Sequence, residues 1–184
     1  TSAAPALGWL LGISFLALLV KLDSPGPVFH RGVRTGWRGK PFRIFKFRTM
    51  HVGLEKTGGL STAREDARVT RFGRFLRRYK LDEMPQLLNV LRGEMSLVGP
   101  RPLLMQYLDR YSAGQARRHE VKPGITGWAQ VNGRNAVTWE EKFSLDVWYV
   151  DHISLTLDLR ILLLTAWKVL KREGINPPHE GRRC

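Results

Sequence analysis

The chain has 184 residues, of which 43% are hydrophobic and 25% charged, proportions that suit one folded domain and exclude an intrinsically disordered segment. Lysine and arginine number 30 against 16 acidic residues, so the net charge is +14 and the expected partners are polyanions: nucleic acid, acidic lipids or phosphorylated substrates. The single cysteine, Cys184, excludes an internal disulfide and a cysteine-built zinc site.

An uncharged, mostly apolar segment covers residues 1–20, and its densest part runs from Leu7 to Val20. That length is borderline for a membrane-spanning helix, which needs about 20 apolar residues. Basic residues follow from Lys21 onward, and an excess of cations marks the cytoplasmic side of a membrane segment. A buried core helix is the less favoured alternative, because nothing else in the chain is apolar enough to surround it. We therefore expect a membrane-embedded helix over residues 1–22 and a cytoplasmic domain over residues 23–184.

Two short strands are predicted after a Pro/Gly-rich breaker at residues 23–27, one over residues 28–30 and one over residues 42–48. Side chains alternate between the two faces of a strand, so Lys46 and Arg48 would share one face. We expect these two neighbouring cations to bind phosphate oxygens.

The apolar spacing becomes helical from Asp66 onward, with arginines on the other faces. One face of this helix is apolar: Val69, Phe72, Leu76 and Tyr79. A basic amphipathic helix suits a membrane surface with anionic lipids, although an ordinary surface helix has the same pattern. A second short helix is predicted from Met84 to Leu91, and Gly93 would end it.

Two acids, Asp82 and Glu83, stand where that second helix is expected to begin, directly after an arginine-rich stretch. The partial positive charge of a helix N-terminus and nearby guanidinium groups both favour an ionised carboxylate. Such a carboxylate could act as a nucleophile among phosphate groups. Asp is also a preferred N-cap, and capping is the commoner role of such a pair. Both interpretations stay open on these residues alone.

Arg101 lies between two prolines, in the segment Gly99–Pro102. Pro100 has a fixed φ, and Pro102 favours an extended backbone at Arg101. The loop would therefore present the Arg101 side chain with little backbone entropy left to lose, which suits a third phosphate-binding cation.

The C-terminal third is predicted to hold one strand and two helices. Turn signals at residues 122–124 and 132–133 enclose a strand that would contain Trp128 to Val131 and end in a tight hairpin. A capping box at residues 138–141 begins a helix that reaches about Val150. The last helix is expected from about Leu157 to Glu173. Together these elements predict an α+β fold with a small sheet or hairpin.

The familiar nucleotide-binding loops are missing, since neither a Walker loop nor a strand-linked dinucleotide fingerprint occurs in the sequence. The five histidines lack the spacing of metal ligands, so zinc is not expected. Acidic side chains combined with phosphates favour a hard divalent cation instead, most simply Mg²⁺.

Four segments resemble the bacterial sugar transferase family, whose small members are the monotopic phosphoglycosyl transferases: Lys46–Met50, Leu81–Leu87, Asn89–Pro102 and Lys122–Asn135. The likeness runs from about Lys21 to Gly174. In that family a sugar-1-phosphate passes from a UDP-sugar to a polyprenyl (undecaprenyl) phosphate, and UMP is released. The resemblance implies catalysis at the cytoplasmic face of a bacterial inner membrane, as the first membrane step in building a glycoconjugate.

The resemblance also implies roles for individual residues. Asp82 would be the nucleophile that forms a covalent phospho-sugar intermediate, and Glu83 would be its partner and a Mg²⁺ ligand. Further site residues would bind substrate and phosphate: Arg48, Arg77, Arg101, Arg134 and Asp146. With Lys46, these make up the candidate site.

The membrane segment departs from the family pattern. The family usually has a re-entrant helix that is broken at a Ser-Pro pair, but here Leu10 and Leu11 occupy that place and Pro5 is the nearby proline. Either the break lies at Pro5 or the first helical half is absent. We expect the helix to enter the membrane without crossing it, with amphipathic interfacial helices beside it.

Two other functions would also suit a basic chain. A membrane-tethered nucleic-acid-binding module could use the arginines of residues 68–80 as a phosphate-binding stripe. No nucleic-acid motif occurs, however, and acids in the middle of the basic face would oppose binding, so nucleic acid is not the expected partner. A purely structural peripheral membrane protein would be indifferent to the loss of Asp82.

Overall fold

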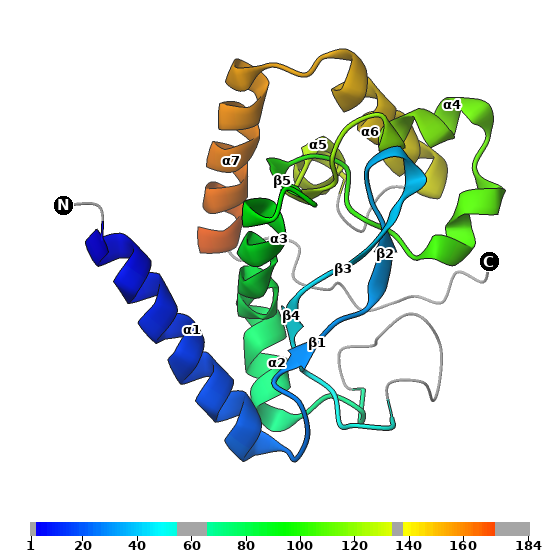
Figure 1. The fold of residues 1–184 in the computed structure, drawn as a ribbon. Helices are drawn as coiled ribbons and strands as arrows, with labels where there is room; N and C mark the ends of the chain where they lie inside the picture. Colours follow the sequence, from blue (N-terminus) through cyan, green and yellow to red (C-terminus); the bar gives the residue numbers. More distant parts are fainter. Residues whose placement is uncertain (1–2, 55–65, 134–137, 172–184) are drawn as a thin grey trace. The chain divides into compact units, whose positions relative to one another are not determined.

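The computed structural model describes residues 3–54, 66–133 and 138–171, in which helices and short strands are combined (Figure 1). This mixture confirms the predicted α+β class. The described residues form two compact units. Unit 1 contains residues 3–31, 45–54 and 66–85, and unit 2 contains residues 32–44, 86–133 and 138–171.

Unit 1 is built from two helices, a two-stranded ribbon and a 3₁₀ turn. Its elements are α1 (Ala3–Asp23), β1 (Phe29–His30), β4 (Lys46–Phe47), α2 (Arg71–Arg78) and η2 (Leu81–Gln86), whose last residue falls in unit 2. β1 and β4 are antiparallel, and Phe29 is paired with Phe47. The core of the unit consists of Val20, Phe47 and Leu76, each 3% exposed or less, so α1, β4 and α2 meet there.

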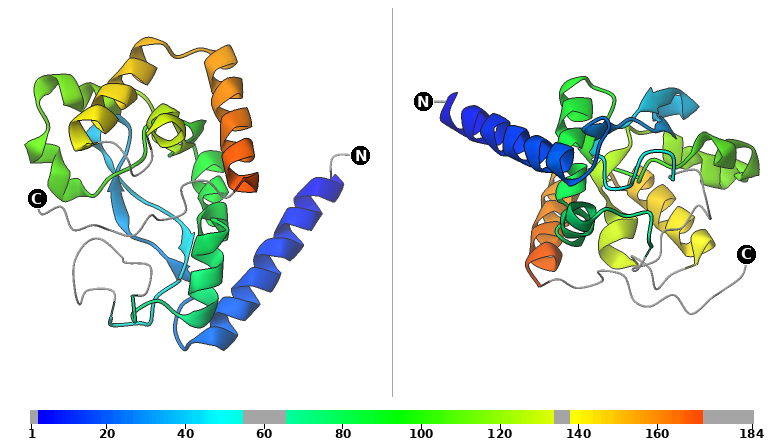
Figure 2. Two further views of the ribbon diagram at one scale, coloured as in Figure 1. Left: turned by 180° about the vertical axis from the view of Figure 1, so that it is seen from behind. Right: turned by 90° about the horizontal axis from the view of Figure 1, so that it is seen from below.

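Helix α1 has two apolar faces with different surroundings. One face packs against the core of unit 1 through Ile13, Leu16, Ala17 and Val20. The other face is exposed: Leu11 (63%), Phe15 (61%), Leu18 (55%) and Leu22 (73%). The C-terminal end of α1 meets α2, while its N-terminal half diverges from α2 in every view (Figures 1 and 2). Over the described ranges, no helix is at once long and apolar enough to pass through a membrane.

The start of α2 is fixed by two side chains and one glycine. The Thr70 hydroxyl accepts a hydrogen bond from the Gly73 N–H, and the Asp23 carboxylate at the end of α1 accepts one from the Phe72 N–H at 3.1 Å. Gly73 lies directly on Thr49, so a Cβ there would collide with the Thr49 backbone. The missing side chain lets α2 approach the segment that follows β4.

Unit 2 holds two further strand pairs and a set of helices. An antiparallel hairpin joins β2 (Val33–Thr35) to β3 (Pro41–Arg43) across η1 (Trp37–Gly39), and β5 (Ser96–Val98) is parallel to β6 (Gly124–Thr126). The helices and 3₁₀ turns are α3 (Leu87–Leu91), η3 (Met105–Arg110), α4 (Ala113–Ala116), η4 (Arg117–His119), α5 (Trp128–Asn132), α6 (Trp139–Asp151) and α7 (Leu155–Leu170). Its core contains Val98, Val131, Tyr149 and Ile161, from β5, α5, α6 and α7.

Several elements agree with the sequence predictions. The capping box of α6 is complete, because the Thr138 and Glu141 side chains each accept a hydrogen bond from the backbone N–H of the other residue. α2 begins at Arg71, later than the pattern from Asp66 suggested, because Thr70 is the cap that fixes its start. Gly93 has the positive φ of 74° expected of a helix-ending glycine.

Two predicted strands are wrong. The strand expected over residues 42–48 is divided into β3 and β4, which pair with different partners. Ile44 and Phe45 are both buried, and two consecutive buried side chains break the alternation of a single strand. The predicted hairpin strand is the helix α5, and Gly133 lies at its C-cap instead of in a hairpin turn.

The close contact of α2 with Thr49 makes a testable prediction. Gly73→Ala should lower the free energy of unfolding by about 1–3 kcal/mol, because the added methyl group must displace packed backbone. Thermal unfolding in detergent, followed by circular dichroism, measures the effect. Gly114→Ala in α4 is the control, since its Cβ would meet no atom closer than 3.9 Å. Equal stability of the two variants would contradict the packing described for Gly73.

Candidate active site

Asp82 and Glu83 lie in the first turn of η2, directly after a sharp change in backbone direction. Lys80 adopts a left-handed conformation with φ 58°, which separates α2 from η2. Asp82 is only 9% exposed, and its Oδ1 has no hydrogen-bond partner among the residues that the structure describes. A capping carboxylate would accept a backbone N–H, so this unpartnered oxygen does not behave as a helix cap.

Glu83 is held by Lys46 of β4. The Lys46 Nζ donates to Glu83 Oε1 at 2.7 Å, and the two side chains are 21% and 11% exposed. A partly buried pair of this length is a charge-assisted hydrogen bond and fixes both side chains. The pair brings a cation within electrostatic reach of Asp82 as well.

Burial dominates the electrostatics of Asp82. Desolvation raises the pKa of Asp82, and the neighbouring Glu83 raises it further, while the charges of Lys46, Lys80 and Arg77 oppose the rise. The net direction is opposite to the lowering that the basic surroundings predicted from sequence. Burial therefore favours the neutral acid at Asp82, and the nearby cations favour the carboxylate.

Two other candidate cations of unit 1, Arg77 and Arg48, donate hydrogen bonds to neighbouring segments of the chain. Arg77 Nε donates to Thr49 Oγ1 at 2.8 Å, and burial lowers the pKa of Arg77 while the charge of Asp82 raises it.

Arg48 is buried and donates through Nη2 to the Ser24 carbonyl at 2.5 Å and to the Ser24 hydroxyl at 3.0 Å. These contacts place the Arg48 cation at the C-terminal end of α1, where it complements the helix dipole. Lys46 thus contacts Glu83 and Arg48 contacts the end of α1, and their binding of phosphate oxygens stays a prediction.

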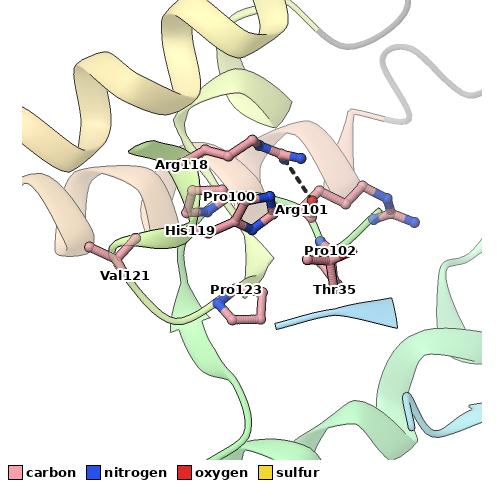
Figure 3. Close-up of a pocket in the computed structure, with 8 residues that line it drawn as sticks. All are labelled: Thr35, Pro100, Arg101, Pro102, Arg118, His119, Val121 and Pro123. Atoms are coloured by element: carbon pink, nitrogen blue, oxygen red, sulfur yellow. Dashed lines mark hydrogen bonds between the residues drawn. The ribbon is translucent and has the colours of Figure 1, made fainter. Parts of the chain in front are cut away.

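Unit 2 brings together Arg101 and Asp146, which lie far apart in sequence. Asp146 on α6 is 4% exposed and accepts from Arg118 at 2.7 Å from Nη2 and 3.1 Å from Nε. Arg118 Nη2 also donates to the backbone carbonyl of Arg101 at 2.8 Å (Figure 3). Burial raises the pKa of Asp146, and the Arg118 charge opposes that rise. The remaining candidate, Arg134, lies outside the described residues.

Sequence analysis missed Arg118. It stands between Arg117 and His119 without a recognisable motif, and only the fold shows that it faces Asp146, 28 residues away. A small pocket beside it is lined by Thr35, Pro100, Arg101, Pro102, Arg118, His119, Val121 and Pro123 (Figure 3). The side chains of Arg118 and His119 thus line the same pocket as Arg101.

Metal-binding capacity is limited to small sets of acids. Within residues 3–54, 66–133 and 138–171, no three or more His, Cys, Asp or Glu side chains are grouped so as to hold a metal ion. The adjacent acids Asp82 and Glu83 could supply one or two oxygen ligands, which is the number that proteins commonly offer to a Mg²⁺ ion bound together with substrate phosphates.

Comparison with known proteins places the chain in a family. A family model described as bacterial sugar transferase matches residues 2–172. The uncharacterized sugar transferase EpsL of Bacillus subtilis is 58% identical over 89% of this chain and 80% of its own length. The UDP-glucose:undecaprenyl-phosphate glucose-1-phosphate transferases of Xanthomonas campestris and Escherichia coli are 48% and 45% identical over 84% and 83% of this chain. The chain spans about a third of those two proteins, 34% and 35% of their lengths.

The chain therefore belongs to the bacterial sugar transferase family and is an enzyme of the transferase class. This confirms the resemblance drawn from its motifs.

His119 makes a prediction about stability and pH. Burial, with a contribution from the Arg118 charge, lowers the pKa of His119 to about 4, below the ordinary value of about 6.5. Between these values the unfolded chain binds a proton that the folded chain does not, so the folded state loses stability as pH falls from about 6.5 to about 4. His119→Gln should reduce this loss, as measured by denaturant unfolding at several pH values. The exposed His152 provides the control, and a His119→Gln variant that keeps the pH slope of His152→Gln would refute the prediction.

Proposed function

We propose that the chain is a phosphoglycosyl transferase that moves a sugar-1-phosphate from a UDP-sugar to a polyprenyl phosphate and releases UMP. The observation that carries the proposal is the buried Asp82 carboxylate, whose Oδ1 is unpartnered beside the Glu83–Lys46 pair. The names of the two glucose-1-phosphate transferases above support a UDP-sugar donor and an undecaprenyl phosphate acceptor. The reaction would be the first membrane step in assembling an O-antigen, a capsule, an exopolysaccharide or a glycoprotein glycan.

The proposed reaction has two displacements at one phosphorus atom. An Asp82 carboxylate oxygen attacks the β-phosphorus of the UDP-sugar, and the bond from that phosphorus to the oxygen bridging the α-phosphate breaks. UMP leaves, and an acyl phosphate that carries the sugar remains on Asp82. A phosphate oxygen of the polyprenyl phosphate then attacks the same phosphorus, the acyl–phosphate bond breaks, and the carboxylate is restored. Covalent catalysis thus divides a displacement between two anions into two steps.

The surrounding side chains suit this chemistry. Lys46 fixes Glu83 next to the nucleophile, and the positive charge of Arg77 is close enough to influence Asp82. We propose that Arg77, Arg101 and Arg134 bind phosphoryl oxygens, because the planar guanidinium group can donate to two oxygens at once. Arg48 also stays a candidate substrate-binding residue, although its Nη2 contacts the end of α1.

We also propose that the enzyme uses Mg²⁺, with Glu83 as a ligand. Mg²⁺ is usually bound by one or two carboxylates together with substrate phosphates, and the adjacent acids of η2 fit that requirement. When bound, the ion would neutralise negative charge on the phosphoryl oxygens.

Helix α1 supports an association with membrane lipids. Its exposed face is a stripe of large apolar side chains, namely Leu11, Phe15, Leu18 and Leu22, opposite the face that packs on unit 1. Burial of such a stripe in acyl chains would remove a large apolar area from water. We propose that α1 enters the cytoplasmic leaflet, keeps both ends on the cytoplasmic side, and sets the catalytic residues at the membrane surface.

The nucleophile is tested by trapping the intermediate. Pure protein incubated with a UDP-sugar radiolabelled in the sugar, Mg²⁺ and no lipid should acquire one label per chain, which hydroxylamine removes. Asp82→Asn should acquire none, because an amide cannot form the acyl phosphate, yet should unfold at a temperature no lower than wild type, since it removes a buried charge. Asp151→Asn, which alters an exposed ion pair, serves as the matched control. Normal UMP release by Asp82→Asn would contradict the covalent mechanism.

Glu83 should behave differently from Asp82. Glu83→Gln keeps the nucleophile but loses the charge that binds Mg²⁺ and Lys46, so label should accumulate slowly and excess Mg²⁺ should partly restore the rate. Complete loss of labelling at every Mg²⁺ concentration would show that Glu83 is needed for the attack itself.

The membrane proposal is tested by cysteine accessibility. In a Cys184→Ser background, single cysteines at Ser2 and at the exposed Pro27 should both react with a membrane-impermeant reagent only when the cytoplasmic face is open. Labelling of the Ser2 position from the periplasmic side would establish a spanning helix and refute the proposed geometry.

A further inference from the structure

All three guanidinium nitrogens of Arg118 donate hydrogen bonds to other residues of unit 2. Nε and Nη2 donate to Asp146, Nη1 donates to the Tyr111 hydroxyl at 3.1 Å, and Nη2 also donates to the Arg101 carbonyl. The group lies 5.3 Å from the centre of the Phe143 ring. The Arg118 residue is 3% exposed, and Asp146 is 4% exposed. The Arg118 cation is therefore turned toward its protein partners and not toward solvent, where a substrate anion would bind.

Arg101, which is expected to bind phosphate, is joined to the buried pair through its backbone carbonyl. Three backbone carbonyls around it accept hydrogen bonds: that of Pro100 from Gly124 N–H at 3.0 Å, that of Arg101 from Arg118 Nη2 at 2.8 Å, and that of Leu103 from Thr35 N–H at 2.9 Å. The first and third donors are backbone groups of β6 and β2. The Arg101 carbonyl alone of the three relies on a side chain, and that side chain is charged.

We propose that Arg118 and Asp146 are positioning residues, which hold the Arg101 backbone so that its guanidinium group meets the phosphate oxygens of the donor. This inference rests on the proposed function, because it assigns Arg101 to the donor diphosphate. Pro100 and Pro102 restrict the backbone on either side of Arg101. The bond from Arg118 fixes the peptide between them, and Asp146 balances the charge of Arg118, which burial would otherwise make costly. Asp146 thus acts through Arg118 and does not touch the substrate.

A matched control exists on the same two elements. Arg117, the neighbour of Arg118 on η4, forms an ion pair with Asp151 on α6, just as Arg118 does with Asp146. The Arg117 and Asp151 side chains are 43% and 40% exposed, and no hydrogen bond joins Arg117 to Arg101 among the described residues. Both ion pairs join η4 to α6, but only Arg118 also donates to the Arg101 carbonyl. The same replacement in each pair therefore distinguishes the effect of that bond from the effect of joining η4 to α6.

The experiment compares Arg118→Met/Asp146→Leu with Arg117→Met/Asp151→Leu. Apolar residues in place of both charges of a buried pair usually preserve the fold, so the first variant should unfold at about the wild-type temperature. Its rate of UMP release should nevertheless fall roughly tenfold or more, since the bond to the Arg101 carbonyl is gone. The control variant should keep the wild-type rate. If Arg118→Met/Asp146→Leu does not fold, Arg118→Lys keeps the charge near Asp146 but cannot make all four contacts, and should show the same loss.

A double-mutant cycle distinguishes positioning from a merely structural role. With Arg101→Ala already present, the Arg118 and Asp146 substitutions should change the rate by less than about twofold, because there is no guanidinium group left to position. A further tenfold loss in that background, or a wild-type rate in Arg118→Met/Asp146→Leu, would overturn the inference.

Backbone amide hydrogen exchange tests the positioning role without relying on catalytic activity, so it can fail or succeed independently of the proposed function. If the wild-type chain releases no UMP from any UDP-sugar, the proposed function fails, and the positioning role is judged from the peptide that covers residues 100–104. Faster exchange of this peptide in the Arg118 variant, and not in the Arg117 control, supports the hold on Arg101. Equal exchange in both variants refutes it.

Discussion

The burial of the Asp82 carboxylate is the constraint on which the arrangement of unit 1 depends. A carboxylate oxygen that is removed from water and lacks a hydrogen bond is costly to keep ionised, and the fold must offset that cost with nearby positive charge. The charges of Lys46, Lys80 and Arg77 provide it from β4, from the left-handed residue after α2, and from the last turn of α2. The ionised form of Asp82 therefore depends on the positions of all three of these elements.

The end of β4 connects the acids, the core and the apolar helix α1 within three residues. Lys46 binds Glu83, Phe47 is 1% exposed in the core of unit 1, and Arg48 donates to the Val20 carbonyl in the last turn of α1. The Phe47 ring packs in the hydrophobic core, whereas the charged groups of Lys46 and Arg48 make polar contacts. Three consecutive residues thus contact the Glu83 carboxylate, the core of unit 1 and the C-terminal end of α1.

The sequence predicted those elements whose determinants are local. The capping box of α6, the helical spacing of α2 and the ending of α3 before Gly93 all depend on residues within a few positions of each other, and all three are present. The division of residues 42–48 was not predictable in this way, because β3 and β4 pair with different strands. The Asn132-Gly133 pair was misleading for a similar reason: β6 already pairs with β5, and the residues after it form α5.

In the candidate site, too, the contacts of individual side chains were not predictable from the sequence. The family resemblance implied that Asp82 is the nucleophile and that Asp146 binds substrate, and burial raises the pKa of both carboxyl groups. Their partners separate them. Asp146 accepts two hydrogen bonds from Arg118 and is electrically balanced, whereas Asp82 Oδ1 accepts none. The contacts that create this difference join residues 28 and 37 positions apart, namely Arg118 with Asp146 and Lys46 with Glu83, so only the fold reveals them. A carboxylate that accepts its hydrogen bonds from one buried arginine can orient that arginine, whereas a carboxylate with an unpartnered oxygen has room for a new bond. The contacts of the two aspartates therefore agree with the different roles that the resemblance implied.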